Sequence, residues 1–313
     1  MASIAYLGPE GTFTEAALLQ MIDAGMVPRH GPAAVQGMPV ESTIAALDSV
    51  RDGAAAYACV PIENSIDGSI MPTLDSLAIG TPLQVFAELT LDVAFSIVVK
   101  PGRVAADVRT LAAFPVAAAQ VRRWLAAHLP AAELHPANSN AEAAQQVADG
   151  RVDAAVSSPL AATHRGLSTL ADGVVDEANA CTRFVLVGPP GPPPARTGAD
   201  RTSVVLRIDN APSALVSALA EFGMRGIDLT RIESRPTRTE LGTYVFFLDC
   251  VGHIHDDAVA EALKALHRRC TDVRYLGSWP TGVLAGSPPP HVDEASRWLA
   301  GLGGGPTDEG SAR

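Results

Sequence analysis

The sequence predicts an α/β protein in two parts, a bilobed α/β domain followed by a smaller βαββαβ unit. At 313 residues the chain is longer than one hydrophobic core usually holds. Strand patterns alternate with helix patterns before residue 189, which is typical of a parallel sheet with helices on its faces. The proline-rich segment 189–200 then interrupts all periodicity, so the remaining residues form a separate domain.

The first lobe begins with the apolar strand Ser3–Leu7, which ends in a Gly-Pro-Glu-Gly-Thr turn. Thr12 or Thr14 can cap the helix that follows, and Ser42 can cap a second helix. Ala55–Val60 has the pattern of a buried strand that is broken by a proline. Ligand sites in such sheets lie at the carboxyl ends of strands, so polar residues at these ends are the first functional candidates.

We expect the long β-rich run Val85–Val99 to carry the chain into a second lobe. The alternating elements expected there are a strand at Thr110–Ala113, a helix at Val116–His128, a strand near Glu133–His135, a helix at Asn140–Asp149 and a strand at Asp153–Val156. Phe184–Gly188 is then a final strand that returns to the first lobe. Two such crossings would leave a cleft between the lobes.

Beyond the linker, about 75 residues carry the pattern of a ferredoxin-like unit. Its expected strands and helices are Thr202–Ile208, Ser213–Phe222, Leu229–Arg235, Thr243–Val251, Ala258–Arg268 and Val273–Leu276. The open face of such a sheet predicts self-association. Residues 281–313 are rich in glycine, proline and charge, and we expect them to be disordered.

Composition limits the partners and the compartment. The net charge of -11 offers no basic face to offset phosphate repulsion, so we expect no binding to nucleic acid or acidic membranes. No stretch approaches the roughly 20 apolar residues of a membrane span, and no signal peptide is apparent at the N-terminus. The four cysteines lack Cys-x-x-Cys spacing, which argues against a disulfide framework or a zinc site. We therefore expect a cytoplasmic protein.

Polar side chains gather beside two of the expected strands. Glu63, Asn64 and Ser65 follow the strand that ends at residue 60, and Thr182 and Arg183 precede the final strand. Turn chemistry alone explains an asparagine there, and a strand-edge threonine often satisfies a backbone group. The functional alternative is that loops at strand ends concentrate polar groups where they bind a ligand.

Other positions also carry a functional and a structural interpretation. The turn that contains Gly11 and Thr12 resembles an anion-holding turn at a helix N-terminus, with backbone N–H groups as donors. Gln120 lies on an alanine-rich helix, where a solvated polar side chain is the structural alternative. His253 and His255 lie two residues apart without carboxylate support, so we expect no metal site there.

Four motifs in this order resemble the prephenate dehydratase family, in its monofunctional form with a C-terminal ACT regulatory domain. The motifs are Gly8-Pro-Glu-Gly-Thr-Phe13, Pro61-Ile-Glu-Asn-Ser65, Thr182-Arg-Phe184 and Glu233-Ser-Arg-Pro236. The resemblance implies a bilobed catalytic domain similar to periplasmic binding proteins over residues 1–188, a linker over 189–200 and an ACT domain over 201–280.

The resemblance further implies that the protein converts prephenate to phenylpyruvate with loss of water and carbon dioxide, in phenylalanine biosynthesis and without a cofactor. The implied active site comprises catalytic Thr182, Asn64 and Gln120 and substrate-binding Thr12, Ser65, Arg183 and Phe184. Family members often have a serine where this chain has Ala113. Arogenate dehydratase, which acts on the transaminated substrate, and a non-catalytic amino-acid sensor are the alternatives.

Regulation by phenylalanine is implied by the same resemblance. The family binds this amino acid between subunits, and the matching positions here are Ala214, Leu215, Glu233, Ser234 and Arg235. Ser213 replaces the glycine that usually begins the first of these segments. Because backbone approaches an amino acid most easily at glycine, this replacement predicts an altered affinity. A homodimer or homotetramer is expected.

Overall fold

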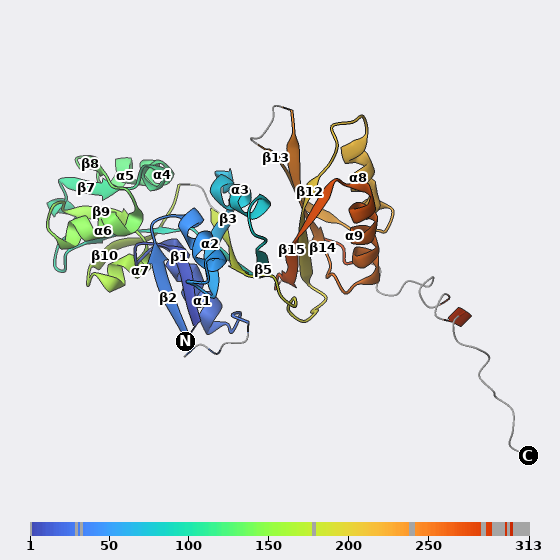
Figure 1. The fold of residues 1–313 in the computed structure, drawn as a ribbon. Helices are drawn as coiled ribbons and strands as arrows, with labels where there is room; N and C mark the ends of the chain where they lie inside the picture. The colour runs from blue at the N-terminus through green and yellow to red at the C-terminus, as the bar shows by residue number, and fades with distance from the viewer. Residues whose placement is uncertain are drawn as a thin grey trace, which may run out of the picture. The chain divides into compact units, whose positions relative to one another are not determined.

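The computed structural model describes residues 2–28, 31, 34–176, 180–237, 242–282, 286–289, 298 and 301–302. The chain divides into two compact units, Met1–Gly191 and Pro192–Arg313. The first unit contains two α/β lobes, and the second contains a four-stranded sheet with helices on one face (Figure 1). Among the described residues, no helix combines the length and apolar character needed to cross a bilayer.

The first lobe is built on a sheet with the strand order β2-β1-β3-β11-β5, and the short β4 pairs with β3. Its elements are β1 (Ala2–Leu7), α1 (Phe13–Asp23), β2 (Val35–Val40), α2 (Thr43–Arg51), β3 (Tyr57–Asn64), β4 (Gly68–Ser69), α3 (Met71–Ala78), β5 (Gln84–Asp92) and β11 (Cys181–Gly188). β1 runs parallel to β2 and β3, whereas β11 is antiparallel to both of its neighbours. α1 packs Leu18 and Met21 against Tyr6 and Phe184 of the sheet.

The second lobe has its own sheet, with the order β10-β6-β9-β7-β8. Its elements are β6 (Phe95–Val99), a 3-10 turn (Ala105–Asp107), β7 (Thr110–Ala113), α4 (Pro115–Gln120), α5 (Arg122–His128), β8 (Glu133–Pro136), α6 (Asn140–Ala148), β9 (Ala154–Ser157), α7 (Pro159–His164) and β10 (Ser168–Val174). Small aliphatic side chains, many of them alanine, fill both faces of this sheet.

The chain crosses between the lobes twice, from β5 to β6 and from β10 to β11, as the sequence predicted. Near the first crossing, the rings of Phe13 on α1 and Phe95 on β6 meet edge to face, with centroids 5.6 Å apart. The fold is therefore the bilobed α/β arrangement that the alternating pattern indicated. Its lobes already touch beside the crossings.

Two element predictions were wrong in detail. The strand expected to break at Pro61 continues to Asn64, because Pro61 lies where the β3–β11 register shifts and the ladder does not depend on its missing N–H. The helix expected at Val116–His128 is two helices that meet at Val121. The β-rich run Val85–Val99 does carry the chain into the second lobe, as two strands that belong to different sheets.

The predicted helix caps on the first lobe are confirmed. Thr12 is the N-cap of α1 and accepts a hydrogen bond from the Glu15 N–H, and Ser42 caps α2 in the same way through the Ala45 N–H. Each cap satisfies an N–H that the helix itself leaves unpaired. Both caps therefore fix the loops that follow β1 and β2, at the carboxyl ends of those strands.

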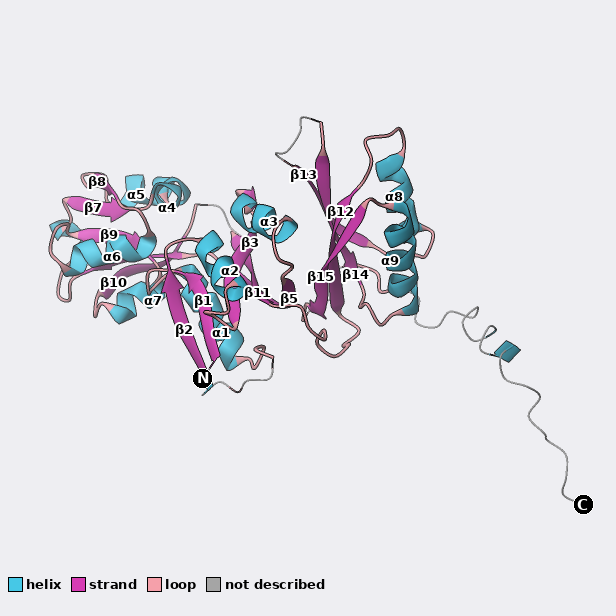
Figure 2. Ribbon diagram, viewed as in Figure 1, coloured by secondary structure: helices cyan, strands magenta, loops and turns pink. Residues whose placement is uncertain are grey.

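The second unit has the predicted βαββαβ order. Its elements are β12 (Asp200–Arg207), α8 (Ala214–Gly223), β13 (Leu229–Pro236), β14 (Tyr244–Val251), α9 (Asp257–Arg269) and β15 (Asp272–Pro280). The antiparallel sheet has the order β13-β14-β12-β15, so β13 is an edge strand. α8 and α9 lie side by side on one face of it (Figure 2), where Phe222 and Leu266 join the core.

No helix or strand forms between Gly188 and Asp200, although part of this linker is fixed to the second unit. The ring of the buried His253 lies with Nε2 3.1 Å from the Pro194 carbonyl oxygen. Arg196 pairs with the Asp256 carboxylate at 2.8 Å. The disorder expected over 281–313 falls mostly outside the described residues.

Candidate active site

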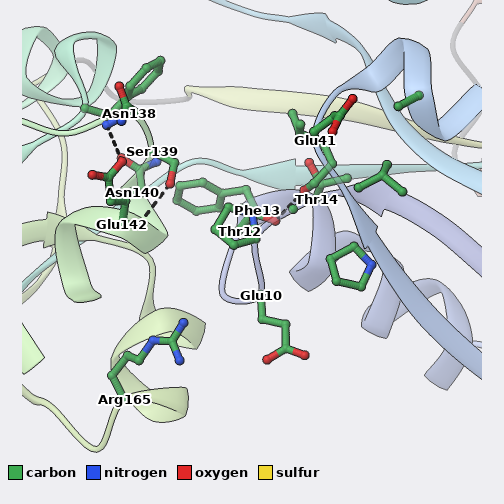
Figure 3. Close-up of a pocket in the computed structure, with 17 residues that line it drawn as sticks. Glu10, Thr12, Phe13, Thr14, Glu41, Asn138, Ser139, Asn140, Glu142 and Arg165 are labelled. Carbon is green, nitrogen blue, oxygen red and sulfur yellow. Dashed lines mark hydrogen bonds between the residues drawn. The ribbon is translucent and has the colours of Figure 1, made fainter. Parts of the chain in front are cut away.

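A cavity of about 1240 Å³ lies between the two lobes of the first unit (Figure 3). The first lobe lines it with the turn after β1, the start of α1 and the end of β2. The second lobe contributes Phe114 after β7, residues 138–140 and 142 around the start of α6, and Arg165 after α7. The cavity thus occupies the cleft where strand ends of both sheets meet. Of the active-site residues that the sequence predicted, Thr12 lines it, whereas the others are not among its lining residues: Asn64, Ser65, Gln120, Thr182, Arg183 and Phe184.

The turn after β1 is held rigidly between α1 and α7. The Thr12 hydroxyl donates to the Leu7 carbonyl at 3.0 Å and caps α1, while the Gly11 N–H donates to the Glu15 carboxylate. These contacts use the Gly11 donor that the sequence indicated for an anion. Gly11 has a φ of +92°, and a Cβ added there would lie 2.9 Å from the Cα of Ala161 on α7. The Ser158 hydroxyl also donates to the Gly11 carbonyl, so the turn joins the two lobes.

Thr182 and Asn64, which are 118 residues apart in sequence, lie opposite each other on β11 and β3. The Asn64 Nδ2 donates to the Thr182 Oγ1 at 2.9 Å. The orientation of this amide is fixed by its other end, because Oδ1 accepts from the N–H groups of Ile66 and Asp67 at 2.8 and 2.9 Å. The Thr182 oxygen is therefore an acceptor in this pair, and its own proton is left to donate elsewhere.

Ser65 fastens the loop after β3 to the start of β11. Its Oγ accepts from the Cys181 N–H at 2.9 Å, and its own N–H donates to the Cys181 carbonyl at the same distance. These two bonds continue the β3–β11 ladder past Thr182. Ser65 thereby holds Thr182 and Asn64 in register.

Arg183 and Phe184, the other residues of the Thr-Arg-Phe motif, hold the strand on its two faces. The Arg183 guanidinium lies 3.2 Å from the Glu63 carboxylate and 3.9 Å from that of Glu88, with only 11% of its side chain exposed. Because neighbouring side chains in a strand alternate, Thr182 and Phe184 share the opposite face, where Phe184 is buried against α1. Substrate binding by Arg183 and Phe184 stays a prediction.

Gln120 is the last residue of α4, and its side chain is half-buried. Its Oε1 atom is buried and has no hydrogen-bond partner in the part of the chain that the structure describes. Its backbone carbonyl accepts from the Asp176 N–H at 2.8 Å. Ala113, the position at which the resemblance leads us to expect a serine, is buried at the end of β7.

Arg165 is a site residue that sequence reasoning missed. Among the described residues that line the cavity, it is the single basic side chain, and it faces a lining that includes three carboxylates: Glu10, Glu41 and Glu142. The Glu142 carboxylate already accepts a hydrogen bond from the Asn138 N–H at 2.9 Å, and this bond lowers its pKa. No local signal marks Arg165, because it follows α7, a short helix without a strong periodic pattern.

The predicted effector residues of the second unit lie on α8 and on the edge strand β13. Ser213, which precedes α8, has a φ of +64° and is the single non-glycine residue with a positive φ among those described. Ala214 and Leu215 then begin the helix. On β13, Ser234 lies opposite Phe246, whose ring packs into the helix-covered core, whereas Glu233 and Arg235 point to the other face. Of the three predicted effector residues on β13, Ser234 is thus the one that shares a face with α8.

Comparison with known proteins identifies both units. The family model described as prephenate dehydratase matches residues 4–191, and the ACT domain model matches residues 202–268. The chain is 79% identical over 309 residues to the prephenate dehydratase of Mycobacterium tuberculosis, with 99% of this chain and 96% of that protein covered.

Two solved structures extend the comparison. The prephenate dehydratase of Arthrobacter aurescens in complex with L-Phe has a TM-score of 0.83 and 39% identity, with 96% of this chain and 99% of that chain covered. GqqA, described as a novel type of quorum quenching acylase, has a TM-score of 0.77 and 28% identity, with 89% and 97% covered.

Proposed function

This chain belongs to the prephenate dehydratase family, and we propose that it converts prephenate to phenylpyruvate as a carbon–oxygen lyase. Prephenate carries a ring carboxylate, a ring hydroxyl across a cyclohexadiene and a pyruvyl side chain. When carbon dioxide leaves, its electron pair moves through the diene and expels the hydroxyl, which leaves an aromatic ring. The main task of the enzyme is to give the departing oxygen a proton or a strong hydrogen bond.

The observation that carries this proposal is the direction of the hydrogen bond between Asn64 and Thr182. Since the Asn64 amide donates at 2.9 Å, the Thr182 hydroxyl keeps its proton for a second partner. The departing hydroxyl of prephenate is that partner. A threonine hydroxyl is too weak an acid to titrate, so Thr182 assists a concerted departure as a hydrogen-bond donor.

The cleft must also hold two carboxylates against a net charge of -11. Arg165 binds one of them, as the single cation that lines the described part of the cavity. Phe13 and Phe114 line the same cavity and supply apolar surface. A ring carboxylate placed against such surface is poorly solvated, which favours its loss as neutral carbon dioxide.

Replacing the Thr182 hydroxyl tests the proposal. Thr182→Val keeps the shape of the side chain but removes the proton, and we expect turnover of prephenate to fall by about 10²–10⁴-fold, or ~3–5 kcal/mol. Thr182→Ser keeps a hydroxyl and is the matched control, with turnover near that of the wild type. Phenylpyruvate is followed by its absorbance in alkali. Turnover of Thr182→Val within a few-fold of the wild type would remove Thr182 from the reaction.

The same assay separates the alternatives. An arogenate dehydratase would turn over the transaminated substrate faster than prephenate, and an amino-acid sensor would bind phenylalanine without any turnover. An acylase would need a base to activate its nucleophile. The Asn64 Nδ2 beside Thr182 is a donor and cannot accept a proton, which favours the dehydratase over an acylase at this hydroxyl.

Control by phenylalanine is assigned to the second unit. We propose that the amino acid binds beside α8 and β13, with Ser234 as a principal contact because it shares the helix-covered face with Ala214 and Leu215. In a homodimer or homotetramer, binding there favours one arrangement of subunits and thereby one geometry of the cleft. A biosynthetic role of this kind belongs in the cytoplasm.

A further inference from the structure

We propose that Asp176 is a positioning residue for the dehydration, which acts by holding Gln120 in place. The inference rests on the function proposed above and on the family resemblance, which implies that Gln120 is a catalytic residue. Asp176 lies in the second crossing between the lobes, six residues before Thr182. The segment that carries the reacting hydroxyl therefore also carries the residue that restrains Gln120.

The contact with Gln120 is direct. The Asp176 N–H donates to the Gln120 carbonyl at 2.8 Å, at the last residue of α4. The Gln120 Oε1, by contrast, is buried without a hydrogen-bond partner among the described residues. A side-chain oxygen in this state has no bond of its own to fix it, so its place depends on how firmly the backbone of Gln120 is held.

The Asp176 carboxylate also holds the start of α5, the helix that follows α4. α4 ends at Gln120 and α5 begins at Arg122, with no side-chain cap at Val121 between them. The first N–H groups of a helix lack partners within it. Asp176 supplies acceptors for two of them, through Oδ2 to the Arg123 N–H at 2.7 Å and through Oδ1 to the Trp124 N–H at 3.1 Å.

The Arg123 side chain completes this arrangement. Its Nε lies 3.7 Å from the Asp176 carboxylate, of which 9% is exposed, and its guanidinium also donates to the Asp176 carbonyl. Asp176 thus contacts both helix ends that meet at Val121 as well as the side chain of Arg123. Without the Asp176 carboxylate, the end of α4 would keep its backbone hydrogen bond to Asp176, but Asp176 would no longer be bound to the start of α5.

A double-mutant cycle between Asp176 and Gln120 tests the proposal. We expect Asp176→Asn to lower kcat for prephenate on the order of tenfold to a hundredfold with little change in KM, because a small displacement of a reacting group is costly while substrate affinity depends on other residues. In the Gln120→Ala background, Asp176→Asn should lower kcat by no more than about twofold, since its partner is already gone.

Asp153→Asn is the matched control. Asp153 is also a carboxylate that accepts from two backbone N–H groups, those of Arg109 and Thr110 at 3.0 Å, but it lies just before β9 and is not among the residues that line the cavity. Its effect should be the same in the wild-type and Gln120→Ala backgrounds.

Equal losses from Asp176→Asn in both backgrounds would overturn the proposal. If that variant does not fold, Arg123→Ala serves instead, because the Arg123 side chain is 62% exposed and its removal loosens Asp176; a smaller effect with the same dependence on Gln120 is expected, and an additive one would refute the inference. Wild-type turnover in Gln120→Ala alone would instead show that Gln120 is not catalytic. That result is a failure of the proposed site, visible before the cycle is closed.

Discussion

The direction of the Asn64–Thr182 hydrogen bond makes Asn64→Asp an informative substitution. Aspartate has the same shape, and one of its oxygens can still accept from the N–H groups of Ile66 and Asp67. Its other oxygen replaces the Nδ2 that lies 2.9 Å from Thr182 Oγ1. Because a carboxylate only accepts, the Thr182 hydroxyl must then donate to it and can no longer donate to the substrate.

The size of the effect follows from the bond that must be broken. A hydrogen bond to a charged group contributes about 1.5–3 kcal/mol, and Thr182 would have to give it up before it could assist the departing hydroxyl. At 1.36 kcal/mol per tenfold, this cost lowers kcat by roughly 13- to 160-fold. At Thr182, Asn64→Ala removes a neutral bond of about 0.5–1.5 kcal/mol, which corresponds to roughly 2- to 13-fold in kcat, and it also removes the acceptor for the Ile66 and Asp67 N–H groups.

The two variants therefore rank in an order that a structural role would reverse. If Asn64 served only to hold its turn, Asn64→Asp would keep the turn and would be more active than Asn64→Ala. Steady-state formation of phenylpyruvate at saturating prephenate gives kcat for both variants, and thermal unfolding checks that both are folded. A kcat for Asn64→Asp equal to or above that of Asn64→Ala would refute the reasoning.

Four further predictions concern the cleft and the regulatory unit. Arg165→Gln should raise KM for prephenate about tenfold at nearly constant kcat, since it removes one charged hydrogen bond. A rise in the steady-state KM of less than about threefold would show that the substrate carboxylate does not bind at Arg165. Ser234→Ala should relieve inhibition by phenylalanine and spare uninhibited turnover, and undiminished inhibition in a dose–response assay would move the effector site. Ser213 has a left-handed backbone conformation, which costs non-glycine residues roughly 1–2 kcal/mol, and Ser213→Gly should remove this cost but add entropy to the unfolded chain. Calorimetry should therefore give an unchanged or higher unfolding temperature, and phenylalanine should inhibit at lower concentration. A lower unfolding temperature would contradict this. Burial lowers the pKa of His253 below its ordinary value of about 6.5. The unfolded chain therefore binds the proton more readily, and stability is lost as the pH falls from about 6.5 through the lower pKa of the folded state. Denaturation of the full chain at a series of pH values should show this loss in the wild type and not in His253→Gln.

The sequence predicted the elements whose patterns are local. Thr12 and Ser42 cap their helices as expected, because a capping side chain needs only its own backbone three residues on. β2 was missed, since it contains Gly37 and Pro39 and lacks an alternating pattern. Its place is set instead by pairing with β1, a contact between distant residues that no local window contains.

The candidate site also has residues that the sequence predicted and residues that it did not. Thr182 and Asn64 were singled out by their motifs, and the antiparallel pairing of β11 with β3 brings them together. Arg165 and Asp176 carry no motif, and their contacts depend on a cleft and on a helix junction that form only in the folded chain. The split of Glu233 and Ser234 onto opposite faces follows from strand alternation, but only once the face covered by α8 is known.

Gly11 lies where the two lobes of the first unit approach each other closely. Even a methyl group at this position would meet the backbone of Ala161 across the groove at 2.9 Å, so alanine there would act as a wedge on the side where the halves touch. The close approach of the two lobes at this point thus depends on the absence of a side chain, and a larger residue at position 11 would have to separate α7 from the turn or distort the turn that carries Thr12.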